Sequence, residues 1–219
     1  MKKNYKDIPE SLKGTYADFS KNFGFCWKEF VMTVPAPMFL VTTYKSNGMP
    51  NACMQSWATF TSANRGNGYY AILASVNKGG HLYQSLKAKN EAVINFFSED
   101  RYEACMSTIQ NNQFEVDEIT ASGLTAVKAD WVDAPYVAEC FMNLECRYCW
   151  EKEIAEGDDH VLMCLEVIGA HIDEEALADK LGEKGIPYNV HYPMNPEAVK
   201  EKGCDYVAVL QKKKSSYEY

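Results

Sequence analysis

Apolar residues recur at every second position over several stretches of the chain, which is the spacing of β-strands. The clearest alternation has Met142, Leu144, Cys146, Tyr148 and Trp150 on one face and the intervening residues up to Glu151 on the other. It predicts a strand with one solvent-facing side. The turn formers 156–159 follow, and the run 160–172 is then mostly apolar. We therefore expect a long, mostly buried strand there, paired with the first as a hairpin.

Shorter apolar or β-branched runs predict further strands at 38–44, 69–76 and 92–97. The turn formers 46–48 precede another extended run that begins at Asn51, which indicates a second hairpin. Helical patterns cover residues 82–89, 99–109, 173–181 and 195–202, and the tail 212–219 is polar. Strands and helices do not alternate regularly, so we expect a mainly β fold with peripheral helices, an antiparallel barrel and not a doubly wound parallel sheet.

Composition narrows the class of protein. The 219 residues, 47% of them hydrophobic, suffice for one domain, which we place over 1–219 with a core at about 30–175. A net charge of −8, with only three arginines, argues against a nucleic-acid partner. No uncharged run approaches the roughly 20 apolar residues of a membrane-spanning helix. The basic N-terminus continues into Asp7, Pro9 and Glu10, which is unlike a secretory signal, so we expect a cytoplasmic protein.

The eight cysteines do not form a recognisable metal or disulfide pattern. They lie at positions 26, 53, 105, 140, 146, 149, 164 and 204, mostly among apolar neighbours, as expected of small core residues in a reducing compartment. Cys146 and Cys149 are spaced as a Cys-x-x-Cys pair, but residues three apart on a strand point to opposite faces. We therefore predict neither a chelate nor a disulfide between them, and no metal site.

Two segments have the composition of a binding site. In the first, Ser75, Asn77, Lys78 and His81 flank two glycines where a strand ends and a helix begins. Helix N-termini carry unpaired N–H groups and a partial positive charge, so this corner could hold a phosphate. The alternative is an ordinary strand-to-helix loop with a solvated lysine. The dinucleotide-binding glycine fingerprint is absent, so a nucleotide site would be of another type.

The second segment is the extended run that follows the first hairpin turn. Its polar and aromatic residues could border a planar ring: Asn51, Cys53, Met54, Gln55, Ser56 and Trp57. The alternative is an edge strand with Trp57 in the core. His160, beside Asp159, is a candidate for the substrate side of a site, or else a hydrogen-bonded residue at a strand end. His171 and His191 are interpreted as structural.

The order of these segments resembles the flavin reductase-like, flavoredoxin family. The resemblance covers about residues 30–175 and rests on segments 35–43, 48–52, 60–62, 78–81, 93–96, 122–125, 134–140, 143–146 and 159–167. It implies a split β-barrel with Greek-key connections, a homodimer, and one FMN per subunit near the dimer interface. It also implies that Met54 to Trp57 line the isoalloxazine ring. The family's phosphate-binding Arg-x-x-Thr/His motif is Lys78-x-x-His81 in this chain, a lysine where arginine is usual.

The resemblance implies an NAD(P)H-dependent flavin oxidoreductase, with NADH or NADPH as a transient donor that stacks on the flavin. Since the flavin accepts the hydride, no side chain is assigned as a catalytic acid or base. One alternative is an FMN-binding electron carrier without NAD(P)H activity of its own, reduced by an electron-transfer protein partner. Another is an interaction module that keeps the barrel and binds no cofactor.

Overall fold

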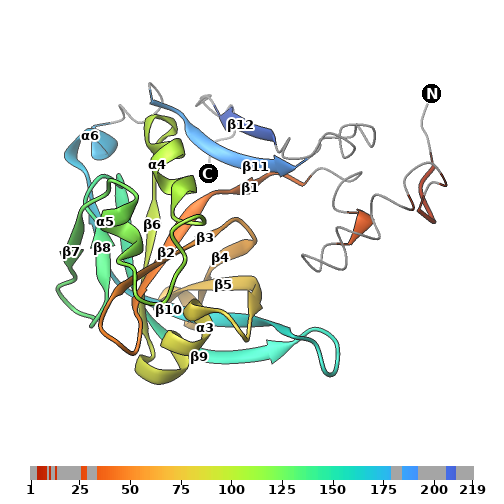
Figure 1. Ribbon diagram of the computed structural model, residues 1–219, viewed down its shortest axis with the longest axis horizontal. Coiled ribbons are helices and arrows are strands. Elements are labelled where there is room, and N and C mark those ends of the chain that lie inside the picture. The colour runs from red at the N-terminus through yellow and green to blue at the C-terminus, as the bar shows by residue number, and fades with distance from the viewer. Residues whose placement is uncertain are drawn as a thin grey trace. The chain divides into compact units, whose positions relative to one another are not determined.

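A computed structural model describes residues 4–8, 10, 13, 26–28, 34–178, 184–191 and 206–210 (Figure 1). The chain divides into two compact units, one of residues 1–36 and 188–208 and the other of residues 37–187 and 209–219. The second unit holds the main sheet and the candidate site. The predicted helix 195–202 and the polar tail 212–219 lie outside the described residues.

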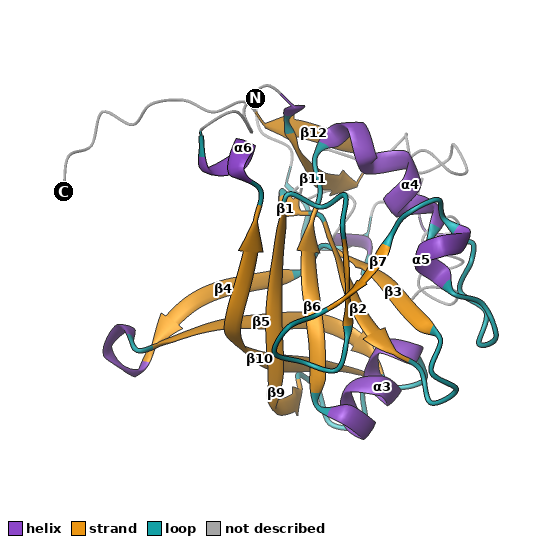
Figure 2. Ribbon diagram, turned by 90° about the vertical axis from the view of Figure 1, so that its left-hand side faces the viewer, coloured by secondary structure: helices purple, strands orange, loops and turns teal. Residues whose placement is uncertain are grey.

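The main sheet has seven strands, each antiparallel to its neighbours (Figure 2). Their order is β3 (Pro50–Gln55), β2 (Phe39–Tyr44), β6 (Glu91–Phe96), β9 (Met142–Glu153), β10 (His160–Ile172), β5 (Gly68–Asn77) and β4 (Ala58–Ala63). β3 and β4 are consecutive in the chain yet form the two edges of the sheet. The predicted antiparallel, mainly β fold with peripheral helices is confirmed.

The remaining strands form two smaller sheets. β7 (Ala126–Lys128) pairs with β8 (Pro135–Val137), and β1 (Ala36–Pro37), β11 (Ile186–His191) and β12 (Tyr206–Leu210) form a three-stranded sheet in the order β1-β11-β12. The helices are α3 (His81–Lys89), α4 (Tyr102–Ser107), α5 (Glu118–Ala121) and α6 (Glu174–Leu177). Among the described residues, no helix combines the length and the apolarity needed to cross a membrane.

Most predicted elements are present, with shifted ends. The two predicted hairpins are β2–β3 and β9–β10, and the strands at 69–76 and 92–97 are β5 and β6. The pattern at 99–109 is a 3-10 turn, Glu99–Arg101, followed by the short helix α4. The predicted helix 173–181 is α6 as far as it is described. The sequence pattern did not single out β4, β7 or β8, which have no clear run of apolar residues.

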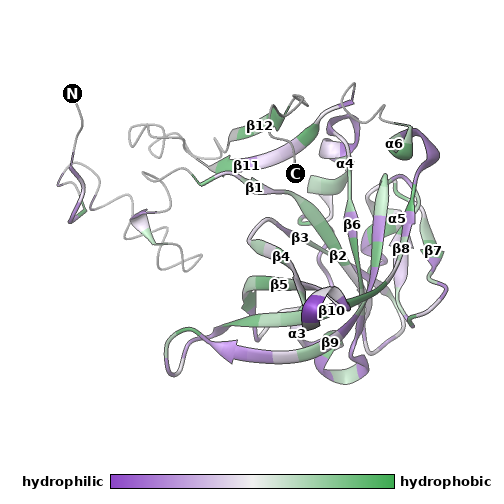
Figure 3. Ribbon diagram, turned by 180° about the vertical axis from the view of Figure 1, so that it is seen from behind, coloured by the Kyte–Doolittle hydropathy of each residue, from purple (hydrophilic) through white to green (hydrophobic). Residues whose placement is uncertain are grey.

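The apolar core lies on one face of the main sheet. Its fully buried side chains include Phe39, Leu73, Ile94, Met163 and Leu165, which come from β2, β5, β6 and β10. Figure 3 shows hydrophobic residues concentrated along β2 and β5. These strands therefore hold the sheet together by burial of apolar surface, the dominant favourable term in folding.

The predicted alternation of β9 fails beyond Tyr148 because the strand contains a β-bulge. Tyr148 pairs with Leu165 and Trp150 with Cys164, which leaves Cys149 as an extra residue. The faces exchange at this point. Trp150, expected beside Tyr148 on the buried face, is 45% exposed. Glu151 instead turns inward and accepts hydrogen bonds from the hydroxyls of Tyr83 and Tyr148.

The expected solvent-facing side of β9 is buried at its start. The Asn143 amide donates to Asn95 Oδ1 (2.9 Å), which also accepts from the backbone N–H of Val137 (2.9 Å). The Asn95 amide in turn donates to Thr42 Oγ1 (2.9 Å). The prediction of one solvent-facing side is therefore wrong here, because the β7–β8 segment covers this face and satisfies its polar groups.

Glu145 is buried for the same reason. Its carboxylate accepts the backbone N–H groups of Asp130 (2.9 Å) and Trp131 (2.7 Å), and it lies 2.6 Å from His171 Nε2. The His171 ring is stacked between Trp131 and Tyr136, with centroids 5.3 and 4.9 Å away. Burial alone would raise the pKa of Glu145, but these hydrogen bonds hold it below its usual value. This arrangement agrees with a structural His171.

Candidate functional site

A cavity of about 590 Å³ lies where β3, the end of β5 and the start of α3 meet the turn after α4. Its walls are residues 51–55, 75–77, 79–82, 108, 109 and 112. Such a volume falls in the range of small-molecule sites. The cavity brings together the two segments that the sequence singled out, although they are some 20 residues apart in the chain.

Seven of the predicted site residues line this cavity: Asn51, Cys53, Met54, Gln55, Ser75, Asn77 and His81. Ser56, Trp57, Lys78 and His160 are not among the lining residues. β3 is an edge strand, as the alternative interpretation of this segment expects, but Trp57 is half-buried and not part of the core. The sequence did not point to the wall formed by Thr108, Ile109 and Asn112, which carries no distinctive pattern.

The corner between β5 and α3 is built around Asn77. Its side-chain oxygen accepts the N–H of Gly79 (2.7 Å) and its carbonyl accepts the N–H of Gly80 (3.0 Å), the N-cap residue of α3. A Cβ atom at either glycine would lie only 3.2 or 3.3 Å from Asn77, tighter than most such contacts. Ser75 has a φ of 54°, uncommon for a residue with a side chain. The corner thus turns the first residues of α3 toward the cavity.

The start of α3 gives this wall a positive character. N–H groups in the first turn of a helix have no partner within the helix and carry part of its dipole. His81 and Leu82, the first two residues of α3, both line the cavity. The two glycines before them add no side chain that would keep a ligand from the backbone. An anion fits this end of the cavity.

The ammonium group of Lys78 contacts the β9–β10 hairpin, and Lys78 is not among the residues that line the cavity. Its ammonium group forms an ion pair with Glu153 and a hydrogen bond of 2.5 Å to the carbonyl of Asp158. Both partners belong to the β9–β10 hairpin. The hydrogen bond to Glu153 raises the pKa of Lys78, and the same contact lowers the pKa of Glu153. Lys78 could reach a ligand in the cavity only by leaving this pair.

His160 has the features of the strand-end alternative. It is the first residue of β10, lies opposite Asn77 of β5, and its backbone N–H donates to Asp158 Oδ1 (3.0 Å). Its Nδ1 atom is 3.7 Å from the same carboxylate. These contacts account for a polar residue at this position without a ligand.

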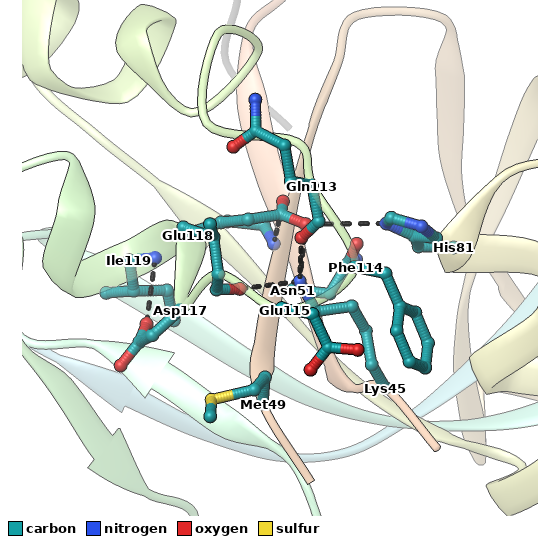
Figure 4. Close-up of polar contacts among 12 residues, drawn as sticks. Lys45, Met49, Asn51, His81, Gln113, Phe114, Glu115, Asp117, Glu118 and Ile119 are labelled. Atoms are coloured by element: carbon teal, nitrogen blue, oxygen red, sulfur yellow. Dashed lines mark hydrogen bonds and ion pairs between the residues drawn. The ribbon is translucent and has the colours of Figure 1, made fainter. Parts of the chain in front are cut away.

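A buried ion pair lies beside His81, a residue of the cavity wall (Figure 4). Lys45, which follows β2, donates to Glu118 Oε1 (3.0 Å) and to the carbonyls of Gln113 (2.8 Å) and Val116 (2.6 Å). The other oxygen of Glu118 accepts the N–H of Ala52 in β3 (3.0 Å). Both side chains of the pair are about 1% exposed. The sequence did not identify this pair, since lysine and glutamate are rarely buried and these two are far apart in the chain.

His81 connects the ion pair to the cavity. Its Nδ1 atom is 3.5 Å from Glu118 Oε1 (Figure 4). Its ring and that of Phe114 are arranged edge to face, with centroids 5.9 Å apart. Nδ1 is buried and makes no hydrogen bond within the described part of the chain. His81 is therefore held by packing and by the charge of Glu118, while its ring forms part of the wall.

The lining offers little for acid–base or nucleophilic catalysis. Cys53 and His81 carry the only ionisable side chains among the residues that form the wall. Burial, and to a smaller extent the charge of Glu118, raises the pKa of Cys53 even though Gln55 hydrogen-bonds to its sulfur (3.3 Å). A protonated thiol is a poor nucleophile. A bound cofactor would suit such a wall better than a catalytic side chain.

Residues 31–190 match the family described as the flavin reductase like domain, which is more than half of the chain. The chain belongs to this family. A protein of Aquifex aeolicus (strain VF5) is 28% identical over 134 residues, 60% of this chain and 66% of that protein, so the chain covers just under two thirds of that relative. Membership of the family supports a redox function linked to flavin.

Solved structures show the same fold. The flavoredoxin of Desulfovibrio vulgaris (Miyazaki F) is 20% identical, with a TM-score of 0.67 over 84% of this chain and 92% of that one. The NADH:FAD oxidoreductase SgcE6 of Streptomyces globisporus C-1027 is 19% identical, with a TM-score of 0.56 over 78% and 89%. The chain therefore has the split β-barrel fold that the sequence resemblance implies.

Three potential metal ligands of this flavin reductase like chain gather away from the cavity. Ligand atoms of Asp130, Glu145 and His171 lie within 4.8 Å of one another. Both oxygens of Glu145 already accept hydrogen bonds from backbone N–H groups, and His171 is held between two aromatic rings. A cation would have to compete with these contacts, so the cluster is explained by its structural role.

We expect Lys45→Met to destabilise the protein by about 3–5 kcal/mol, because it leaves the Glu118 carboxylate buried without its partner. The double variant Lys45→Met/Glu118→Gln removes both charges and keeps an oxygen for the Ala52 N–H. It should therefore be more stable than Lys45→Met alone. Urea unfolding followed by circular dichroism measures both. Additive losses from the two single substitutions would contradict the ion pair.

Proposed function

We propose that the cavity binds FMN and that the protein passes electrons from NADH or NADPH, through the flavin, to free flavin or to a downstream acceptor. Family membership and the cavity between β3 and α3 support this proposal. The observation that carries it is the convergence of an edge strand and a helix N-terminus on one cavity of small-molecule size. The cytoplasmic location, like the absence of nucleic-acid and membrane partners, remains a prediction from the sequence.

The edge strand suits the ring of a flavin. β3 pairs with β2 on one side only, and Ala52 turns its N–H away from β2, toward Glu118. Because strand residues alternate with a period of two, Met54 presents its backbone N–H on the same free edge. Gln55 and Cys53 add polar side-chain atoms to this wall. These groups could hydrogen-bond the edge of an isoalloxazine ring, with Ser56 and Trp57 beyond it.

The α3 corner suits the phosphate. The first-turn N–H groups of α3 can donate to an anion, and Ser75, Asn77 and His81 place polar side chains beside them. The buried Nδ1 of His81 lacks a hydrogen-bond partner in the described structure, and protonation of the ring would add a positive charge at this end. Lys78 would contribute its charge by exchanging Glu153 for the phosphate.

When bound, the flavin supplies the electron-accepting chemistry, and the protein supplies orientation and electrostatics. β3 would hold one edge of the ring and α3 would hold the phosphate. Because most side chains of the wall are neutral, backbone dipoles would dominate the electrostatic environment of the flavin. The purified chain should be yellow, or should stay yellow when unbound FMN is removed by gel filtration after its addition. A protein that retains no FMN would favour a cofactor-free interaction module.

Lys78→Glu tests the position of the phosphate. We expect the dissociation constant for FMN to rise roughly tenfold or more, because a charge-assisted hydrogen bond is lost and a second carboxylate is placed near Glu153 and the ligand. Quenching of FMN fluorescence measures the affinity. Lys87→Glu is the matched control, since Lys87 is also on the α3 side, also pairs with a glutamate (Glu151), and is absent from the cavity wall. Equal affinities for both variants and the original chain would show that the site is misplaced.

Electron donation is tested by steady-state oxidation of NADH and of NADPH, followed at 340 nm with FMN present. We expect turnover with at least one donor and none without flavin. Tight FMN binding with no turnover for either donor would refute the reductase. It would favour the electron carrier, in which a protein partner reduces the flavin.

We also propose that the protein is a homodimer, as the sequence resemblance implies. The cavity opens beside β3, an edge strand, so a second subunit could complete its outer side. Light scattering after size-exclusion chromatography should give twice the monomer mass of 24.8 kDa. A monomer in dilute solution that still binds FMN tightly would contradict a cofactor held at a subunit interface.

A further inference from the structure

The β-bulge in β9 places two cysteines face to face on neighbouring strands. Cys164 of β10 lies opposite Trp150, and the next pair joins Leu165 to Tyr148, so Cys149 is the extra residue between them. In a bulge, two residues of one strand share the place opposite a single residue of the other. Cys149 and Trp150 therefore both face Cys164.

The spacing of the strands permits a covalent link. Residues that face one another across an antiparallel pair have Cα atoms roughly 4.5–5.5 Å apart. Disulfides span Cα separations of roughly 4.4–6.8 Å. Burial is the main cause that raises the pKa of Cys164, and the charge and hydrogen bonding of Cys149 raise it further, in agreement with the strand register that brings the two side chains together.

The two sulfurs differ in accessibility. Cys149 is exposed, whereas Cys164 is only 3% exposed. Burial, followed by the charge and the hydrogen bond of Cys149, raises the pKa of Cys164 to about 11. Cys105 and Cys140 also contact one another, but both are buried. In the Cys149–Cys164 pair, a small dissolved molecule can therefore reach the outer thiol of Cys149. The inner thiol of Cys164 can then react only with Cys149.

We propose that Cys149 and Cys164 form a reversible disulfide by exchange with a low-molecular-weight disulfide of the glutathione class. This redox site is separate from the cavity and does not depend on flavin binding. The expectation of no disulfide between Cys146 and Cys149 on one strand is unaffected, because Cys164 belongs to the neighbouring strand.

The exchange proceeds in two balanced steps. The Cys149 thiolate attacks one sulfur of glutathione disulfide, which forms a mixed disulfide at Cys149 and releases one glutathione thiolate. Cys164 then loses its proton to solvent, and its thiolate attacks the Cys149 sulfur and displaces the second glutathione thiolate. Two protein thiols are oxidised and one glutathione disulfide is reduced to two glutathione molecules. Excess reduced glutathione reverses the sequence, as expected in a reducing compartment.

Mass spectrometry of the full chain tests this proposal. The fully reduced protein is incubated with glutathione disulfide, quenched with iodoacetamide and digested. We expect a linked peptide that joins Cys149 to Cys164, without retained glutathione. Cys164→Ser should stop at the mixed disulfide and keep one glutathione on Cys149. Cys149→Ser should leave Cys164 unmodified, because its sulfur is buried. Cys26→Ser, which removes another exposed thiol, is the control and should not alter the linkage.

The rate of the second step provides an independent measurement. Since the attacking thiolate forms only when Cys164 loses its proton, the closure rate should rise up to roughly tenfold per pH unit below its pKa. Circular dichroism checks that each variant is folded. The proposal is overturned if glutathione remains on Cys149 of the original chain without closure, if Cys149 does not react, or if it links to a different cysteine.

Discussion

The buried pair of Lys45 and Glu118 is the interaction on which the candidate site depends. Lys45 joins the end of β2 to two backbone carbonyls of the loop before α5. Glu118 joins the start of α5 to β3 through the Ala52 N–H, and its other oxygen faces His81 of α3. These contacts reach two walls of the cavity, β3 and the start of α3. Two charges withdrawn from water are costly, so the pair persists only because nearly every polar atom around it is matched.

The bulge at Cys149 also helps to position α3, through contacts that Glu151 makes with this helix. By exchanging the faces of β9, it turns Glu151 inward, where Tyr83 donates to it and Lys87 pairs with it at 3.2 Å. Burial opposes ionisation of Glu151, yet these partners lower its pKa. Two residues further along, Glu153 holds Lys78. A single extra residue in a strand therefore fixes both the side of α3 and the lysine that precedes it.

The sequence predicted the fold where local pattern and tertiary structure agree. The runs 69–76 and 92–97 became β5 and β6 because their apolar residues are buried in the core. The pattern failed where distant segments intervene: Asn143 and Glu145 appear solvent-facing until the β7–β8 segment covers them. Alternation also cannot reveal a bulge, so Trp150 was assigned to the wrong face.

The candidate site was predictable for a similar reason. Residues 51–55 and 75–81 carry polar groups and glycines at places where strands end or lie at an edge, and these features can be seen in the sequence. Thr108 and Asn112 could not be found, because they reach the cavity only through the path of the chain after α4.

The engagement of Lys78 with Glu153 bears on how an anion could be held at α3. An ammonium group that is already neutralised adds little attraction at a distance, so the helix N-terminus and neighbouring side chains must provide the initial attraction. A lysine can then exchange partners, because its charge sits on a flexible four-carbon stem, unlike the fixed fork of an arginine. Solvent screens the Lys78–Glu153 pair, whose side chains are about one third exposed, so the energetic cost of that exchange is small. The pair with Glu153 therefore keeps the charge of Lys78 matched while leaving it free to exchange its partner for an anion.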